Sequence, residues 1–156
     1  MEIRRASVSD AAEIAAVHVR TWQAAYQNVF GTERLAGLDT PRRIAGWTRA
    51  LEEGESIFVA DDDGSVVGFV ALGACEVRAI YALPEAWGSG AGPDLMRAAI
   101  AQLRDDGCVE AFLWVLEDNP RARRFYEREG WSLDGGRREG EHLGLETAEM
   151  RYRIEL

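Results

Sequence analysis

Residues 80–92 read Ile80-Tyr81-Ala82-Leu83-Pro84-Glu85-Ala86-Trp87-Gly88-Ser89-Gly90-Ala91-Gly92. The segment begins as a strand, and the apolar stripe after it, from Leu95 to Leu103, predicts a helix. Three alternating glycines therefore lie between a strand and a helix N-terminus. Glycine removes the Cβ atoms that would hold a phosphate away from the backbone, and the free amides at the positive end of the helix dipole stabilise an anion. The segment predicts a phosphate-binding loop, although its spacing alone is also compatible with an ordinary flexible connection.

The chain before this loop predicts a strand, two helices and then three strands. We expect a strand at 2–6, a helix from Ser9 and Asp10 to about Asn28, a helix from Thr40 and Pro41 to near Gly54, and strands at 56–60, 66–72 and 76–83. The Asp63-Gly64 step between two of these strands is a strong hairpin signal. Because short turns join the last three strands, they should be antiparallel neighbours.

The chain after the loop predicts helix, strand, helix and two final strands. We expect a strand at 111–116, a helix opened by Asn119-Pro120 and closed by Gly130, and two strands around a polar loop at 135–141. The helical crossover after the loop should place the strands on either side of it parallel and adjacent. The sequence therefore predicts one mixed α/β domain over 1–156, with about seven strands and about four helices.

Composition and charge narrow the class of protein. The 156 residues suffice for one domain with a single core. Hydrophobic residues make up 47% of the chain and charged residues 29%, as in globular proteins. The net charge of −9 repels nucleic acid and anionic membranes, so we expect neither as a partner. An acidic surface also attracts a cationic amine, although it is more often simply a solubilising surface.

The cysteines and histidines give no sign of a metal site. Cys75 and Cys108 are far apart in the sequence and form no C-x-x-C pair, and the histidines of the chain are His18 and His142 alone. We therefore expect free, buried thiols in a reducing compartment and no metal. The start of the chain has no apolar segment typical of a signal peptide, and the longest apolar stretch, 66–75, is shorter than the ~20 residues of a membrane span. These features predict a cytoplasmic location.

Two segments resemble one enzyme family. Residues 80–92 are similar to the pyrophosphate loop of the GNAT superfamily of acetyl-CoA-dependent N-acetyltransferases, Q/R-x-x-G-x-G/A, with Gly90 and Gly92 at the required glycines. Residues 113–131, which contain Asn119 and the run Phe125-Tyr126-Glu127, are similar to the strand-Asn-helix-FYE-x-x-GF/W block of that family. With the elements expected before the loop, the resemblance covers essentially the whole chain. It implies a GNAT-like fold with a splayed pair of parallel strands in a central mixed sheet.

The resemblance implies that acetyl-CoA binds as a cosubstrate in the wedge between the splayed strands. Its pantetheine arm would pair with backbone groups of Ile80, Tyr81 and Ala82. Its pyrophosphate would lie on the loop formed by Gly88, Ser89, Gly90, Ala91, Gly92 and Pro93. A backbone N–H near Ala82 would polarise the thioester carbonyl, and an acceptor amine would attack it directly.

Six side chains gain roles from the resemblance, and each has a plainer interpretation. Tyr126 would protonate the departing thiolate, or it is a core residue. Asn119 would hydrogen-bond the cofactor arm, and as an N-cap before proline it already has a structural reason. Glu76, on the face of Ile80 and Ala82 by period-two counting, would take the amine proton through water, or it is a solvated strand-end carboxylate. His18, Trp22 and Tyr26 share a helix face that would border the acceptor site, although core packing explains most of that stripe.

The sequence departs from the family pattern at two places. Trp87 and Ser89 stand where the family commonly has Gln and a basic residue, so a favourable charge near the pyrophosphate is missing. Pro93 removes an amide donor, and Asp94 adds a negative charge close to the phosphates. Both departures predict moderate cofactor affinity.

Rival functions remain open at this level. A dinucleotide-binding oxidoreductase is disfavoured because Pro93 replaces the third glycine and antiparallel strands precede the loop. A catalytically silent acyl-CoA-binding regulatory module on the same fold is the main alternative. The acceptor amine, whether a small molecule or a peptide or protein amine, cannot be read from the sequence, and a homodimer is compatible with it.

Overall fold

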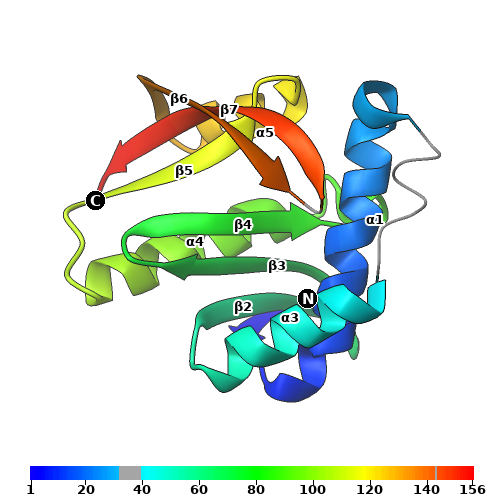
Figure 1. Ribbon diagram of the computed structural model, residues 1–156. Coiled ribbons are helices and arrows are strands. Elements are labelled where there is room, and N and C mark those ends of the chain that lie inside the picture. The colour runs from blue at the N-terminus through cyan, green and yellow to red at the C-terminus, as the bar shows by residue number, and fades with distance from the viewer. Residues whose placement is uncertain (32–39, 143) are drawn as a thin grey trace.

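The computed structural model describes residues 1–31, 40–142 and 144–156. Its helices are α1 (Ala11–Phe30), α3 (Thr40–Glu52), α4 (Ala91–Asp105) and α5 (Pro120–Arg128), with short 3₁₀ turns η1 (Val8–Asp10) and η2 (Pro84–Ala86). Its strands are β1 (Glu2–Arg5), β2 (Ser56–Asp62), β3 (Ser65–Gly73), β4 (Glu76–Ala82), β5 (Glu110–Leu116), β6 (Ser132–His142) and β7 (Leu145–Glu155). Within the described residues the strands form a seven-stranded sheet in the order β1-β2-β3-β4-β5-β7-β6 (Figure 1). The predicted mixed α/β class is confirmed.

The sheet divides at the parallel pair β4 and β5. Strands β1 to β4 are antiparallel neighbours, as the short turns predict, and β5, β7 and β6 form a second antiparallel group. The groups join where Glu76 pairs with Phe112 and the Phe112 amide donates to the Cys75 carbonyl at 3.1 Å. From that junction β4 and β5 diverge toward the C-terminal end of β4 (Figure 1). The structure thus contains the expected splayed parallel pair.

A β-bulge in β4 corrects the predicted orientation of Glu76. Ala71 pairs with Ala79 but Leu72 pairs with Val77, so Arg78 is an extra residue in β4. One extra residue reverses the alternation of side chains. Val77 consequently shares the face of Ile80 in the same hydrophobic cluster, and Glu76 lies on the opposite face. Period-two counting was therefore wrong to place Glu76 with Ile80 and Ala82.

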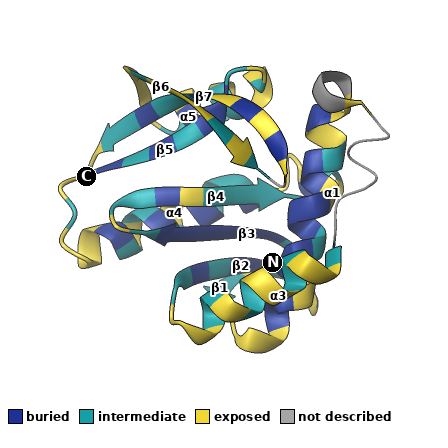
Figure 2. Ribbon diagram, viewed as in Figure 1, coloured by how far each residue is buried: buried dark blue, intermediate teal, exposed yellow. Residues whose placement is uncertain are grey.

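The helices cover the two faces of the sheet with separate apolar clusters. On one face, α4 contributes Leu95, Met96 and Leu103 to the main core, beside Tyr126 from α5. On the other face, Ile14 and Val17 of α1 pack with Phe69 of β3 and with partly buried side chains of α3. Figure 2 shows the resulting pattern, with buried residues along β3 and exposed ones on α3 and on β6. No helix among the described residues is long and apolar enough to cross a membrane.

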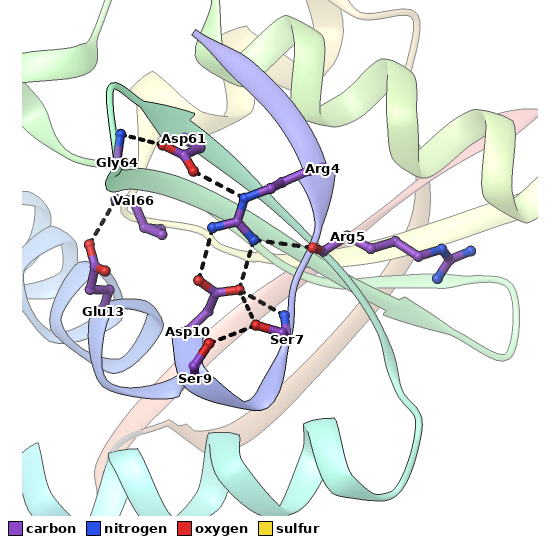
Figure 3. A network of polar contacts seen from close by, with 9 residues as sticks. All are labelled: Arg4, Arg5, Ser7, Ser9, Asp10, Glu13, Asp61, Gly64 and Val66. Carbon is purple, nitrogen blue, oxygen red and sulfur yellow. Dashed lines mark hydrogen bonds and ion pairs between the residues drawn. The ribbon is translucent and has the colours of Figure 1, made fainter.

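An arginine network fixes the start of α1 against the sheet (Figure 3). The Arg4 guanidinium of β1 donates to both carboxylate oxygens of Asp10, at 2.9 and 3.0 Å, and to Asp61 of β2 at 3.0 Å. The Ser7 amide also donates to Asp10, at 2.7 Å. Arg4 and the Ser7 amide hold the pKa of Asp10 below its usual value, Arg4 being the larger cause. Glu13 then accepts from the Val66 amide at 2.8 Å, which orients α1 along β3.

The polar loop expected at 135–141 was wrong. Those residues belong to β6, which pairs with β7 from Arg137 to His142. β6 is one of the two edge strands of the sheet, and most of its side chains are exposed on both faces. An edge strand with no buried face has no apolar alternation, so its Gly-rich, charged sequence looked like a loop.

The expectation of free thiols was also wrong. Cys75 and Cys108 form a disulfide, with their Cα atoms 5.8 Å apart. They are 33 residues apart in sequence, but Cys75 immediately precedes β4 and Cys108 lies two residues before β5, at the end where those strands meet. The fold, and no local spacing motif, brings them together.

Candidate functional site

A cleft of about 830 Å³ opens where β4 and β5 separate. Its lining comes from both strands, the loop between β4 and α4, α5 and one face of α1, with additions from β6 and β7. Ten of the predicted site residues line it, namely Glu76, Ile80, Tyr81, Ala82, Gly88, Gly90, Gly92, Pro93, Asn119 and Tyr126. Ser89 and Ala91 are outside the lining: the Ser89 hydroxyl donates to the Ala86 carbonyl at 2.5 Å, and Ala91 is buried in the core.

The β4 edge that faces the cleft has backbone groups available for pairing. Leu83 donates its amide to Val67 of β3 at 2.8 Å. Because backbone groups alternate between the two edges of a strand, those of Tyr81 also face β3, while those of Ile80 and Ala82 face the gap. The Trp87 indole already donates to the Ala82 carbonyl at 2.9 Å. An extended ligand would therefore pair with Ile80 and the Ala82 amide, and Tyr81 would contribute its side chain.

The glycine loop leads directly into α4. Gly90, the residue before the helix, has a left-handed φ of 93°, and Gly88 has a φ of 81° with open space where a Cβ would stand. Both conformations favour glycine. At Gly92 close packing, not backbone conformation, favours glycine, because a Cβ there would lie 3.2 Å from the Phe125 ring of α5. The loop thus presents bare backbone and the N-terminus of a 15-residue helix to the cleft.

Tyr126 projects from α5 into the cleft. The residue is 7% exposed, and it packs among the buried residues of the main core. Burial, and then the nearby Tyr81, raise the pKa of its phenol well above the usual value. The hydroxyl consequently keeps its proton and can act as a hydrogen-bond donor inside the cleft.

Asn119 combines capping with a link between elements. Its Oδ1 accepts from the Ala122 amide at 3.1 Å, which confirms the predicted N-cap of α5. Its Nδ2 donates to the Tyr26 hydroxyl of α1 at 2.7 Å. The contact with Tyr26 was not foreseen, and it connects α5 to α1 across the cleft.

Glu76 lies in the cleft near the junction of β4 and β5. Burial raises the pKa of its carboxyl, opposed by Arg138 and Arg78 and reinforced by Glu149. Glu149 itself is 8% exposed and accepts from Arg138 at 3.0 Å and from Thr147 at 2.9 Å. Since the bulge turns Glu76 away from Ile80, its carboxylate lies on the same sheet face as Tyr81.

Aromatic side chains form the wall of the cleft on the α1 side. The His142 ring stacks on Trp22 with centroids 4.3 Å apart, and the Trp22 indole donates to the Tyr81 hydroxyl at 3.0 Å. His18 and His142 share a hydrogen bond of 2.8 Å between their Nε2 atoms. The periodicity of α1 already pointed to His18, Trp22 and Tyr26, of which Trp22 and Tyr26 line the cleft and His18 is buried behind them. His142 was missed because it lies on the edge strand whose pattern indicated a loop.

Arg121 is the second residue that sequence reasoning missed. Its guanidinium lies 3.4 Å from the centroid of the Trp87 ring, and both residues line the cleft. The pair joins the first turn of α5 to the glycine loop, far earlier in the chain. The FYE segment indicated this helix, but no local pattern marks which of its arginines meets the loop.

Comparison with known proteins identifies the family. Residues 16–131 match the model of the acetyltransferase (GNAT) family. An uncharacterized N-acetyltransferase of Bacillus subtilis, YuaI, is 33% identical over 129 residues, covering 76% of this chain and 73% of the relative. An uncharacterized N-acetyltransferase of Mycobacterium tuberculosis is 33% identical over 137 residues, covering 83% and 88%. The chain belongs to the GNAT family of acetyltransferases, and it is an enzyme of the acyltransferase class.

Solved structures agree on the fold. A GCN5-related N-acetyltransferase from Rhodopseudomonas palustris superposes with a TM-score of 0.84 at 20% identity, covering 99% of this chain and 95% of that one. The PaiA N-acetyltransferase from Thermoplasma acidophilum, solved in complex with coenzyme A, gives a TM-score of 0.78 at 18% identity and covers 99% and 98%. At these identities the likeness concerns the fold, and the predicted GNAT-like architecture is confirmed.

Proposed function

We propose that this protein is an N-acetyltransferase that moves the acetyl group of acetyl-CoA to an amine acceptor by direct attack. The observation that carries the proposal is the continuity of one cleft. It runs from the glycine loop, along the open edge of β4, to the wall that contains Tyr81 and Trp22 and to the Glu76 carboxylate. The glycine loop at one end would bind phosphate, and the β4 edge in the middle would bind an extended arm. The wall and the carboxylate at the other end would bind an amine.

The residues of the cleft fit acetyl-CoA. Gly88 and Gly90 leave bare backbone at the start of α4, where phosphate oxygens find amide donors and the positive end of the helix dipole. The negative charge of Asp94 is offset by Arg97, which lies 2.5 Å away. The backbone groups of Ile80 are positioned to pair with the pantetheine arm, which leaves the Ala82 amide for the carbonyl oxygen of the thioester. Acetyl-CoA supplies the acetyl group, activated as a thioester, when it is bound.

Side chains and backbone amides of the cleft would accept and donate the protons and hydrogen bonds of the reaction. The amine nitrogen forms a bond to the acetyl carbon, the carbon–sulfur bond breaks, and the amine loses a proton. The Glu76 carboxylate would accept that proton, directly or through water, because it lies in the cleft with a raised pKa. The Tyr126 hydroxyl would donate its proton to the sulfur, and the Ala82 amide would donate to the carbonyl oxygen.

The wall on the α1 side would receive the acceptor. Trp22, Tyr26 and Tyr81 supply aromatic surface in the cleft. Glu76 and Glu141 supply carboxylates there, whereas the Glu149 carboxylate is already paired with Arg138. Aromatic faces and carboxylates both attract an ammonium group before it gives up its proton. This arrangement supports an amine acceptor, either a small molecule or a peptide amine.

Turnover of acetyl-CoA with a panel of amines tests the proposal. Released CoA thiol should appear with at least one amine, and acetyl-CoA alone at ~100 times its dissociation constant should stabilise the fold by about 2.7 kcal/mol. The chain contains no lysine, so acetyl label found on amines of the protein itself is restricted to its N-terminus. Binding without turnover across a broad panel would favour the silent acyl-CoA-binding module. A shift with NAD and none with acetyl-CoA would contradict both functions.

A further inference from the structure

Among the residues that the structure describes, three arginines on α5 have no acidic partner. Arg121, Arg124 and Arg128 follow one another at i, i+3 and i+7, which places them along one side of the helix. We call them the α5 arginine row. Many arginines elsewhere do have carboxylate partners, including Arg4, Arg78, Arg138, Arg151 and Arg153.

The fold holds this row beside the glycine loop. Phe125, on the same helix, contacts the position where a Cβ of Gly92 would stand, so α5 packs directly against the start of α4. Arg121 lies over the Trp87 ring at 3.4 Å, and Arg121 and Arg128 both line the cleft. Trp87 in turn is anchored through its indole N–H to the Ala82 carbonyl. The row therefore borders the mouth of the cleft at its loop end.

The charges of the row repel one another. Burial, followed by Arg128 and Arg124, lowers the pKa of Arg121. In a chain with a net charge of −9, carboxylates are plentiful, and Asp118 is the nearby acidic residue of the cleft lining. Three clustered guanidiniums that meet no carboxylate in the described parts of the chain suit an anion with several oxygens, because planar guanidinium groups match phosphate geometry.

We propose that the α5 arginine row binds the phosphates at the nucleotide end of CoA, with Arg121 stacked on Trp87 as its fixed member. The row supplies the positive charge that the loop lacks at Trp87 and Ser89. The glycine loop offers amides and a helix dipole, and the row offers full charges from the opposite side of the cleft mouth. This inference rests on the proposed use of acetyl-CoA.

Binding measurements with three ligands test the inference. The ligands are CoA, dephospho-CoA, which lacks the 3′-phosphate, and 4′-phosphopantetheine, which lacks the nucleotide. The test variant is the double substitution Arg121→Gln/Arg128→Gln. The matched control is Arg49→Gln/Arg104→Gln, which removes two exposed cations outside the cleft. Thermal unfolding without ligand verifies that both variants fold.

We expect the test variant to bind CoA about ten-fold more weakly at low ionic strength, a loss that shrinks at ~1 M salt, while the control changes by less than about two-fold. Binding of 4′-phosphopantetheine, which keeps only one of the phosphates of CoA, should weaken less than that of CoA. An equal loss for CoA and dephospho-CoA assigns the row to the pyrophosphate, and a loss confined to CoA assigns it to the 3′-phosphate. If the test variant and the control bind CoA alike, the inference fails although the proposed function stands. If the wild-type protein binds no CoA, the proposed function fails, and the inference fails with it.

Discussion

The Tyr126 hydroxyl is a protonated phenol at the inner wall of the cleft. Removing its one oxygen distinguishes a role in proton donation from a role in packing. Phe keeps the ring, so Tyr126→Phe should change the free energy of unfolding by no more than about 0.5–1.5 kcal/mol. A thiolate is a weak base and needs its proton only in part, so kcat should fall by about 10²-fold or less. The affinity for acetyl-CoA should stay near the wild-type value, since the contact strengthens only as charge reaches sulfur. Full kcat in the variant would make Tyr126 a packing residue.

Glu76→Gln tests the proposed base through the pH dependence of kcat/KM. Burial raises the pKa of Glu76, so the carboxylate should lose activity on its acidic side at a higher pH than an exposed glutamate would. The substitution should lower the rate by about 10²–10⁴-fold and remove that acidic limb. A raised carboxyl pKa favours folding at low pH and opposes it at high pH, so the variant should be no less stable at neutral pH. Glu139→Gln, an exposed glutamate of β6, is the control, and identical pH profiles for the two variants would return Glu76 to the plain surface-charge interpretation.

At the scale of elements, the glycine loop is tested by a charge placed at its left-handed residue. Gly90→Asp puts a side chain and a negative charge where the pyrophosphate would approach the backbone, so acetyl-CoA binding should be abolished. Asp also meets a cost of about 1–2 kcal/mol at a positive φ. Gly107→Asp is a matched control, because Gly107 has a φ of 89°, open space where a Cβ would stand, and a place outside the cleft. Calorimetry should find normal acetyl-CoA affinity in the control, and normal affinity in Gly90→Asp would refute the loop assignment.

The contact between α1 and β6 predicts acid sensitivity. Burial lowers the pKa of His18 to about 3 and that of His142 to about 4. The neighbouring His142 adds to the shift of His18, Arg43 lowers both pKa values, and Glu149 opposes the shift of His142. The unfolded chain therefore binds more protons between those values and about 6.5, and stability falls as the pH drops through that range. At pH 5 each histidine should cost about 2 kcal/mol relative to about pH 7.5. Urea unfolding of wild type and His142→Gln at both pH values measures this loss, and an equal loss in the variant would contradict it.

Sequence patterns predicted the helices and strands that bury one face. They failed for features that do not depend on burying an apolar face. The strands from Ser56 to Ala82 alternate because α1 and α4 cover them, so their order and pairing could be predicted. The bulge at Arg78 has no local signal, since one extra residue changes the pairing without changing composition. The edge strand β6 has no apolar face, so it could not be recognised as a strand. The contribution of His142, at the end of this strand, could therefore not be predicted either. Arg121 depends on a contact between α5 and the loop, which only the packed fold defines.

At the scale of the whole molecule, the disulfide lies at the vertex of the wedge. Cys75 precedes β4, Cys108 precedes β5, and the Phe112 amide donates to the Cys75 carbonyl beside them. The 33-residue loop that the bond closes contains β4, the glycine loop and α4, which are the elements proposed to hold acetyl-CoA. The crosslink therefore joins the two antiparallel groups of the sheet at the end opposite the cleft opening, and it leaves the diverging ends free.

Removing the crosslink should affect stability far more than binding. A closed loop of this length restricts the unfolded chain, so Cys75→Ser/Cys108→Ser should lower the free energy of unfolding by about 3–4 kcal/mol. For a chain of this size that loss corresponds to a Tm about 10 °C lower. Because the vertex lies away from the glycine loop and the Ile80 edge, acetyl-CoA affinity at a temperature where the variant is folded should change by less than about two-fold. Thermal unfolding of wild type with and without a thiol reductant gives the internal control: reductant should lower the wild-type Tm to that of the variant and leave the variant unchanged. A wild-type Tm that does not respond to complete reduction, verified by thiol titration, would show that the bond does not stabilise the fold.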